Sequence, residues 1–308
     1  MSGTSERNVS GPEKFVFDEP VDTLNVRIVN GAVNIVGIDD GPARVEVSEI
    51  EGPPLQVRLT GSTLVVTYED MTWKGFLKWF DRKGATRRHA VVSLAVPQHT
   101  KVEVGVVGAG AVISGISGAT SVQGVNGDTT LVGLTGPVKA NTVAGSVEAQ
   151  SLSGDLTFNT VSGDLTVVEG SSSHVKADSV SGNMVLDLDP SAGAQVRLAT
   201  VTGEIAIRIP EPGDAEVDAN TTSGHVSCAF DELRVSGQWG AKKITGRIGG
   251  GSAQLKATTV SGSIALLRRP PLDDVPRPAG PGDGPADGPA DGPAGRTDGD
   301  PTSLRKDI

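Results

Sequence analysis

SGATSVQGVNGDTTLVGLTGPVKANTVAGSVEAQSLSGDLTFNTVSG, residues 117–163, is the stretch that decides the fold of this chain. A small or polar residue followed by glycine returns in it every nine residues. The six pairs are Ser117-Gly118, Asn126-Gly127, Thr135-Gly136, Ala144-Gly145, Ser153-Gly154 and Ser162-Gly163. Repetition at a fixed period indicates a stacked repeat architecture. We therefore expect a solenoid of short β-strands.

Each nine-residue unit has apolar residues at the second and fourth positions after its glycine, and often another at the seventh. After Gly154, for example, Leu156 and Phe158 are apolar, whereas Thr157 and Asn159 are polar. This period of two predicts one strand with one buried face in each unit. We expect the glycine to mark a turn, because it adopts backbone conformations that other residues resist.

The length of the coil follows from a second echo in the sequence. Nine residues are too few for a helical crossover, and hairpins would need longer strands. The segment NTVAG at 141–145 returns as NTVSG at 159–163, eighteen residues later. Looser copies of this segment end at Gly182, Gly203, Gly224 and Gly262. The last step, from Gly224 to Gly262, is 38 residues long, and we interpret it as two coils with a turn near residues 249–251. The prediction is an all-β protein, a parallel β-helix (β-solenoid) with coils of about 18–21 residues.

The chain divides into four parts by composition. Residues 1–13 are polar and expected to be flexible, residues 14–107 form an irregular β region or cap, and residues 108–268 form the solenoid repeats. Residues 269–308 are rich in Pro, Gly and Asp, with DGPA three times in tandem. So few apolar residues cannot offset the entropy of ordering, so we predict a disordered tail.

Charge and composition exclude several classes of function. The net charge is −10 and the pI about 4.9, which argues against nucleic acid as a partner. The N-terminus has no apolar signal-peptide core, and no run of 18 apolar residues occurs. We expect a cytoplasmic protein, with peripheral membrane association left open.

One segment, residues 71–88, departs from the repeat pattern by combining aromatic and basic residues. Its candidate contact residues are Trp73, Lys74, Phe76, Lys78, Trp79, Phe80, Arg82 and Lys83. On a helix, Trp73, Phe76 and Phe80 would share one face. Two interpretations remain open. The segment either plugs the end of the β-helix core or docks on a lipid headgroup region or a protein groove.

No motif for catalysis, cofactor binding or metal binding stands out. The four histidines are far apart, and P-loop, Rossmann and nucleophile-elbow motifs are missing from the sequence. We align the outward positions as one row, Ser121, Thr130, Lys139, Glu148, Thr157 and Thr166, and it is mixed in character. The carboxylates Glu211, Asp214, Glu216 and Asp218 are interpreted as a solvated loop. Turn residues Asp128, Asp155 and Asp164 are expected to accept backbone N–H bonds, not to bind calcium.

The units related to Val161-Ser162-Gly163-Asp164-Leu165, with copies at 152–156, 180–184, 201–205 and 260–264, resemble the bacterial putative-adhesin β-strand-repeat family. Residues 29–35 and the basic stretch before residues 91–97 also resemble it, so the similarity covers roughly residues 15–268. The tail is similar to those of actinobacterial proteins. The resemblance implies a β-helical fold and a binding or structural role, and it transfers no catalytic residues.

We therefore predict a non-enzymatic, adhesin-like binding or scaffolding module without a cofactor. The contact surface would be residues 71–88, facing a protein or a membrane. Two alternatives are a carbohydrate-active β-helix enzyme and a structural protein that assembles by stacking solenoid ends.

Overall fold

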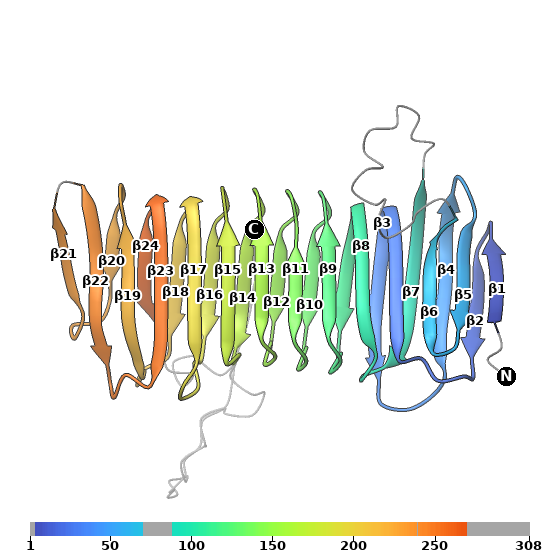
Figure 1. Ribbon diagram of the computed structural model, residues 1–308, viewed down its shortest axis with the longest axis horizontal. Helices are drawn as coiled ribbons and strands as arrows, with labels where there is room; N and C mark the ends of the chain where they lie inside the picture. The colour runs from blue at the N-terminus through green and yellow to red at the C-terminus, as the bar shows by residue number, and fades with distance from the viewer. Residues whose placement is uncertain (1–3, 70–87, 239, 270–308) are drawn as a thin grey trace, which may run out of the picture. The chain divides into compact units, whose positions relative to one another are not determined.

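The computed structural model describes residues 4–69, 88–238 and 240–269, which form β-strands joined by turns. The 24 strands of these described residues lie in one compact unit, residues 1–271. Within the described residues there is no helix that could span a membrane. The strands stack side by side from β1 and β2 at one end to β21 and β22 at the other (Figure 1).

The strands form two facing sheets. In spatial order, the first sheet contains β1 (Thr4–Val9), β5 (Leu55–Thr60), β6 (Thr63–Tyr68), β9 (Thr120–Gly124), β11 (Val138–Asn141), β13 (Leu156–Thr160), β15 (His174–Ser179), β17 (Gln195–Thr202), β23 (Ala253–Ser261), β19 (Ala215–Thr221), β22 (Ala241–Ile248) and β21 (Arg234–Gln238). The second contains β2 (Glu13–Phe17), β4 (Ala43–Glu51), β7 (His89–Pro97), β10 (Thr129–Val132), β12 (Val147–Gln150), β14 (Leu165–Gly170), β16 (Met184–Leu188), β18 (Ile205–Ile209), β24 (Ile264–Arg268) and β20 (Val226–Cys228).

Two long strands, β3 (Thr23–Ile38) and β8 (Lys101–Ser114), join the sheets. Each contributes its first half to the first sheet, between β6 and β9, and its second half to the second sheet, between β7 and β10. Towards the N-terminal end the pairing becomes antiparallel, as in β1–β5 and β2–β4. The predicted all-β solenoid with an irregular N-terminal part is confirmed.

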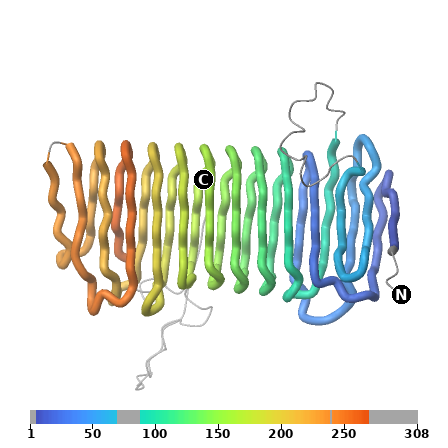
Figure 2. The backbone as a smooth tube through the Cα atoms, viewed as in Figure 1, coloured from blue at the N-terminus to red at the C-terminus, as the bar shows by residue number. Residues whose placement is uncertain are grey.

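The coil repeat is the predicted one. Val138 on β11 pairs with Leu156 on β13, eighteen residues later, in a parallel ladder. The tube view shows these coils repeating evenly through the middle of the unit (Figure 2). The second and fourth positions of each unit point inward: Ala140 and Phe158, for example, are fully buried. Each coil therefore buries its apolar layer on its neighbours, as solenoids must.

The turn glycines are needed for a reason different from the predicted one. Gly154 and Gly163 do not have the positive φ that favours glycine. A Cβ on Gly154 would instead lie 1.8 Å from the carbonyl oxygen of Gly136, and one on Gly163 would lie 2.1 Å from that of Gly145. Stacked turns thus approach so closely that only a hydrogen fits. The left-handed positions are elsewhere in the coil, at Gly115, Gly133, Ser151 and Glu169.

Polar side chains inside the turns bond one coil to the next. The Thr142 hydroxyl donates to Thr160 Oγ1 at 3.0 Å, and Thr160 Oγ1 also accepts the Gly163 N–H at 2.9 Å. The turn aspartates behave as predicted: Asp128 accepts the Ser146 N–H at 3.0 Å, and Asp164 accepts the Asn183 N–H at 2.7 Å. These bonds satisfy backbone groups that would otherwise lie unpaired between coils.

The coils do not stack in chain order near the C-terminus. β23 lies between β17 and β19, and β24 lies between β18 and β20. The chain therefore skips one layer at residues 210–214, continues through β19 and β20, and returns by the β21–β22 hairpin. Its last coil then fills the skipped layer. The prediction of two coils between Gly224 and Gly262 is wrong, because the antiparallel β21–β22 hairpin takes the place of the second coil. The turn predicted near residues 249–251 is present and joins β22 to β23.

Candidate functional site

The residues predicted as a contact surface, Trp73, Lys74, Phe76, Lys78, Trp79, Phe80, Arg82 and Lys83, lie outside the described residues. Both attachment points of the segment are described. Tyr68 ends β6 of the first sheet, and His89 begins β7 of the second. Both strands pair with β3, so the segment is inserted at one turn of a continuous coil. That layer is the third from the N-terminal end, where β1 and β2 form the outermost layer.

Buried contacts fix the base of this insertion. The guanidinium of Arg88 lies over the ring of Tyr68, 5.1 Å from its centroid. The backbone carbonyl of Arg88 accepts a bond from Asn30 Nδ2 at 3.1 Å. Tyr68 is fully buried and Arg88 is 7% exposed. A cation over an aromatic face is worth more when both are desolvated. The insertion therefore starts and ends on a rigid part of the core.

The buried base has a pH signature that can be measured. Burial raises the pKa of Tyr68 from 10.0 to about 12, and the nearby positive charge of Arg88 opposes this rise. Tyr68 is the only tyrosine, so tyrosinate absorbance reports on it alone. We expect half-titration near pH 12 in the folded chain and near pH 10 in urea. Because the folded chain keeps a proton that the unfolded chain loses, stability should fall between pH 10 and 12. A folded-state midpoint at pH 10 would contradict a buried ring.

The insertion leaves the solenoid at an edge that also carries exposed valines. On this valine edge five valines that precede a Ser-Gly or related pair point to solvent: Val143, Val161, Val180, Val201 and Val260, 42–51% exposed. Val125, before Asn126-Gly127 at the same edge, is buried. The Ser162 N–H bonds to the Val143 carbonyl and the Ser181 N–H to that of Val161, so the valines lie in register. At the opposite edge the corresponding Leu134 and Leu152 are buried. The seventh position of the repeat thus has two environments.

Of the four carboxylates predicted to form a solvated loop, Glu211 and Asp214 lie in a loop, whereas Glu216 and Asp218 lie on β19, and the four form no catalytic pair. Glu211 pairs with Arg268 at 3.3 Å, and Asp218 pairs with Lys243 at 3.1 Å. Asp214 accepts the Ser252 N–H at 2.9 Å, and this bond lowers the pKa of its carboxyl. A general acid needs a raised pKa. Across residues 4–69, 88–238 and 240–269, no three His, Cys, Asp or Glu side chains could hold a metal ion together. Nothing in the described part of the chain points to catalysis.

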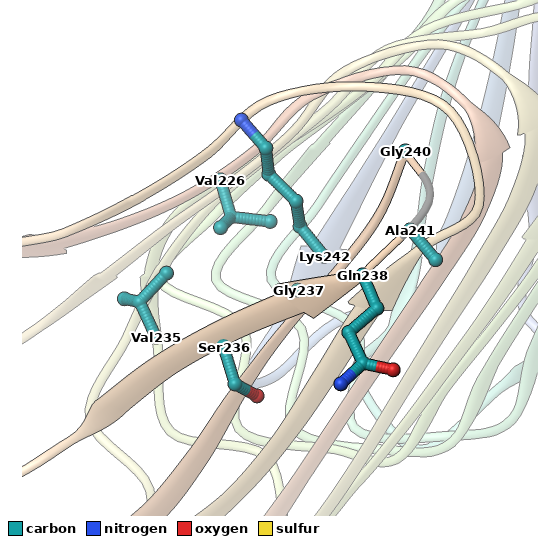
Figure 3. A pocket seen from close by; sticks show the side chains of 8 residues that line it. All are labelled: Val226, Val235, Ser236, Gly237, Gln238, Gly240, Ala241 and Lys242. Carbon is teal, nitrogen blue, oxygen red and sulfur yellow. The ribbon is translucent and has the colours of Figure 1, made fainter.

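The depressions on the described surface are shallow. One, of about 320 Å³, lies at the C-terminal end of the solenoid against the β21–β22 hairpin, between Val226, Val235 and Lys242 (Figure 3). It has the mixed lining of an exposed hairpin and brings no acid–base pair together. Among the described strands β21 pairs only with β22, so its other edge is open. End-to-end stacking of solenoids stays a prediction.

The outward row aligned from the sequence separates into two rows on opposite faces. Ser121, Lys139 and Thr157 lie on the first sheet. Thr130, Glu148 and Thr166 lie on the second sheet. This follows because a coil has two strands, so consecutive nine-residue units alternate between sheets. The mixed character of the predicted row came from combining two different surfaces.

The chain is similar to one protein family and to solved structures of two bacterial proteins. The profile of the Toastrack DUF4097 family matches residues 32–267, from the middle of β3 to β24. No curated protein matches the chain. Two solved structures are similar at 12% identity: a putative cell adhesion protein from Clostridium sporogenes ATCC 15579, with TM-score 0.28 over 84% of this chain and 100% of that one, and a putative lipid binding protein from Parabacteroides distasonis ATCC 8503, with TM-score 0.34 over 85% and 98%.

Proposed function

The chain belongs to the Toastrack DUF4097 family, and we propose that it acts as a non-catalytic binding module whose main contact is the aromatic and basic segment 71–88. The observation that carries the proposal is the base of the insertion, where Tyr68 and Arg88 are buried against each other and Asn30 donates a hydrogen bond to the Arg88 carbonyl. Binding residues are commonly found on loops that a rigid scaffold positions. Here the scaffold is formed by β6 before the insertion and β7 after it, and both strands pair with β3.

The attachment layer supports docking over end-capping. β1 and β2 lie outside β6 and β7, and their inward side chains Val9, Phe15 and Phe17 are buried. The segment therefore starts from the side of the solenoid, on the same edge as the exposed valines. A partner bound to the segment could also contact the exposed valines of this edge if its own surface were apolar. Aromatic residues interleaved with lysine and arginine suit a lipid headgroup region or a protein groove.

The proposal is tested by replacing Trp73, Phe76, Trp79 and Phe80 with serine. We expect binding to phosphatidylglycerol vesicles, or capture of a specific protein from a lysate, to fall at least tenfold while the melting temperature is unchanged. A control variant carries Val36→Ser, Val112→Ser and Val185→Ser, which removes three valines 42–49% exposed on the second sheet. The control should bind normally.

Two results would reject the docking role. Unchanged association in the serine variant would remove the segment from the contact surface. Loss of cooperative unfolding in that variant, with the control folded, would assign the segment to the core as a cap.

A further inference from the structure

Three basic side chains form a contiguous row on the outer face of the first sheet. Lys176 on β15 pairs with Arg197 on β17, and Arg197 pairs with Lys256 on β23. All three are exposed, and neighbours on parallel strands lie roughly 4.8 Å apart. Lys139 continues the row on β11, beyond Thr157. We call Lys176, Arg197 and Lys256 the cation row. The out-of-order β23 completes it.

Of the three cations, only Lys176 makes an ion pair within the described residues, because the carboxylates near Lys256 have other partners. Asp218, beside Lys256, pairs with Lys243 at 3.1 Å, and Glu216 pairs with Arg247 at 3.9 Å. Asp178 pairs with Lys176 at 3.2 Å. Within the described part of the chain, no carboxylate makes an ion pair with Arg197 or Lys256. Like charges directly opposite each other on neighbouring strands destabilise a sheet. Repulsion between the neighbouring positive charges is therefore expected to lower the stability of the sheet at this position.

The row borders a depression that suits oxyanion groups. The depression has a volume of about 230 Å³, and its lining adds His174, Gln195 and Gln254 to the three cations. These three polar residues pair across the same strands, two positions before the cations. Lysine and arginine side chains only donate hydrogen bonds, and glutamine amides can donate beside them. A ligand here must accept several charge-assisted bonds, as carboxylate or sulfate groups do.

The residues around the cation row indicate which kind of macromolecule would supply the carboxylate or sulfate groups. Amide side chains lie next to the row: Asn159 Nδ2 donates to Asn141 Oδ1 at 3.0 Å. Amides and hydroxyls on a flat sheet complement sugar hydroxyls. The exposed large apolar side chains of the described residues lie on the second sheet, on β21 or on the valine edge, where Val201 and Val260 are near the ends of β17 and β23, and none of them lines the depression. A membrane contact would need such residues, and single-stranded nucleic acid would need aromatic ones.

We propose that the cation row of Lys176, Arg197 and Lys256 is a binding site for an acidic polysaccharide, which lies along the solenoid axis with its carboxylate or sulfate groups on the row. The site is separate from segment 71–88, so either one can fail without the other. It uses charge and hydrogen bonds, whereas the sequence of that segment is rich in aromatic residues.

The test uses the full chain with two charge-removing substitutions, Arg197→Gln and Lys256→Gln. The probes are polygalacturonate, which carries carboxylates, and dextran sulfate, with neutral dextran as the uncharged reference. We expect the unmodified chain to bind at least one polyanion and not dextran, with affinity falling roughly tenfold between 50 and 200 mM NaCl. The variant should bind at least tenfold more weakly. Its melting temperature should stay the same or rise, because the repulsion is relieved.

A control variant, Lys14→Gln with Arg44→Gln, removes the same charge from the second sheet, where both side chains are exposed. It should bind like the unmodified chain. Equal weakening of both variants would reduce the effect to net charge and overturn the site. No binding to either polyanion at 50 mM NaCl, or unchanged binding by the Arg197/Lys256 variant, would also overturn it. Binding to duplex DNA or phosphatidylglycerol vesicles that depends on the row, without polyanion binding, would assign it to another partner.

Discussion

A chain that ends after Ser252 is expected to lose the folded structure of residues 215–248. The missing β23 and β24 lie between two coils, so their loss opens the solenoid in its interior and not at its end. The fully buried side chains removed include Leu255, Ile264 and Leu266. At roughly 1.5–3 kcal/mol for each large aliphatic side chain, the direct loss is about 5–9 kcal/mol. Total stabilities of native domains are only about 5–15 kcal/mol.

Limited proteolysis with mass spectrometry measures this result. New cleavage sites should arise between residues 210 and 248, while the coils from β8 to β16 stay protected. The matched control is a chain that ends at Arg269, which keeps every described strand and should be cleaved like the full chain in this region. Equal protection of the two truncated chains would contradict the placement of β23 and β24.

The second large effect concerns the stacked glycines: Gly154→Ala should destabilise the protein by about 3 kcal/mol or more. The added Cβ would meet the carbonyl oxygen of Gly136 at 1.8 Å, and backbone atoms of two stacked turns cannot move apart without breaking their ladder. Overpacking in cores typically costs about 1–3 kcal/mol, and a clash with backbone is at the upper end of that range or beyond it. Urea denaturation measures the change.

Gly11→Ala is the control for this substitution. A Cβ at Gly11 meets nothing within 4 Å, and its φ is not positive. It should change stability by less than about 0.5 kcal/mol. If Gly154→Ala were equally neutral, the turns could not be as closely stacked as the structure has them.

The coil was predictable from the sequence because its causes are local. The alternation around Leu156 and Phe158 sets which side chains are buried, and the nine-residue spacing of glycines sets where turns occur. The reason for glycine was not predictable. A turn sequence shows a preference for a small residue, but not whether backbone strain or the approach of a neighbouring coil imposes it.

The candidate sites divide in the same way. Segment 71–88 was found from composition alone, since aromatic and basic residues gather there in an acidic chain. Its buried base was missed, because Asn30 is 58 residues from Arg88. The cation row was missed for a similar reason. Arg197 and Lys256 lie 59 positions apart and become neighbours only because the last coil returns to a skipped layer.

By itself, the sequence determined that this chain folds as a β-solenoid of roughly 18-residue coils, with inward residues at alternate positions. Consecutive coils pair residues only about 18 positions apart along the chain, so the periodicity of the sequence records this pairing. The tertiary structure alone decided the order of the coils, the distribution of outward residues between two sheets, and hence which charges lie together. Those depend on which strand edges meet, and any parallel strand of matching register can fill an open edge.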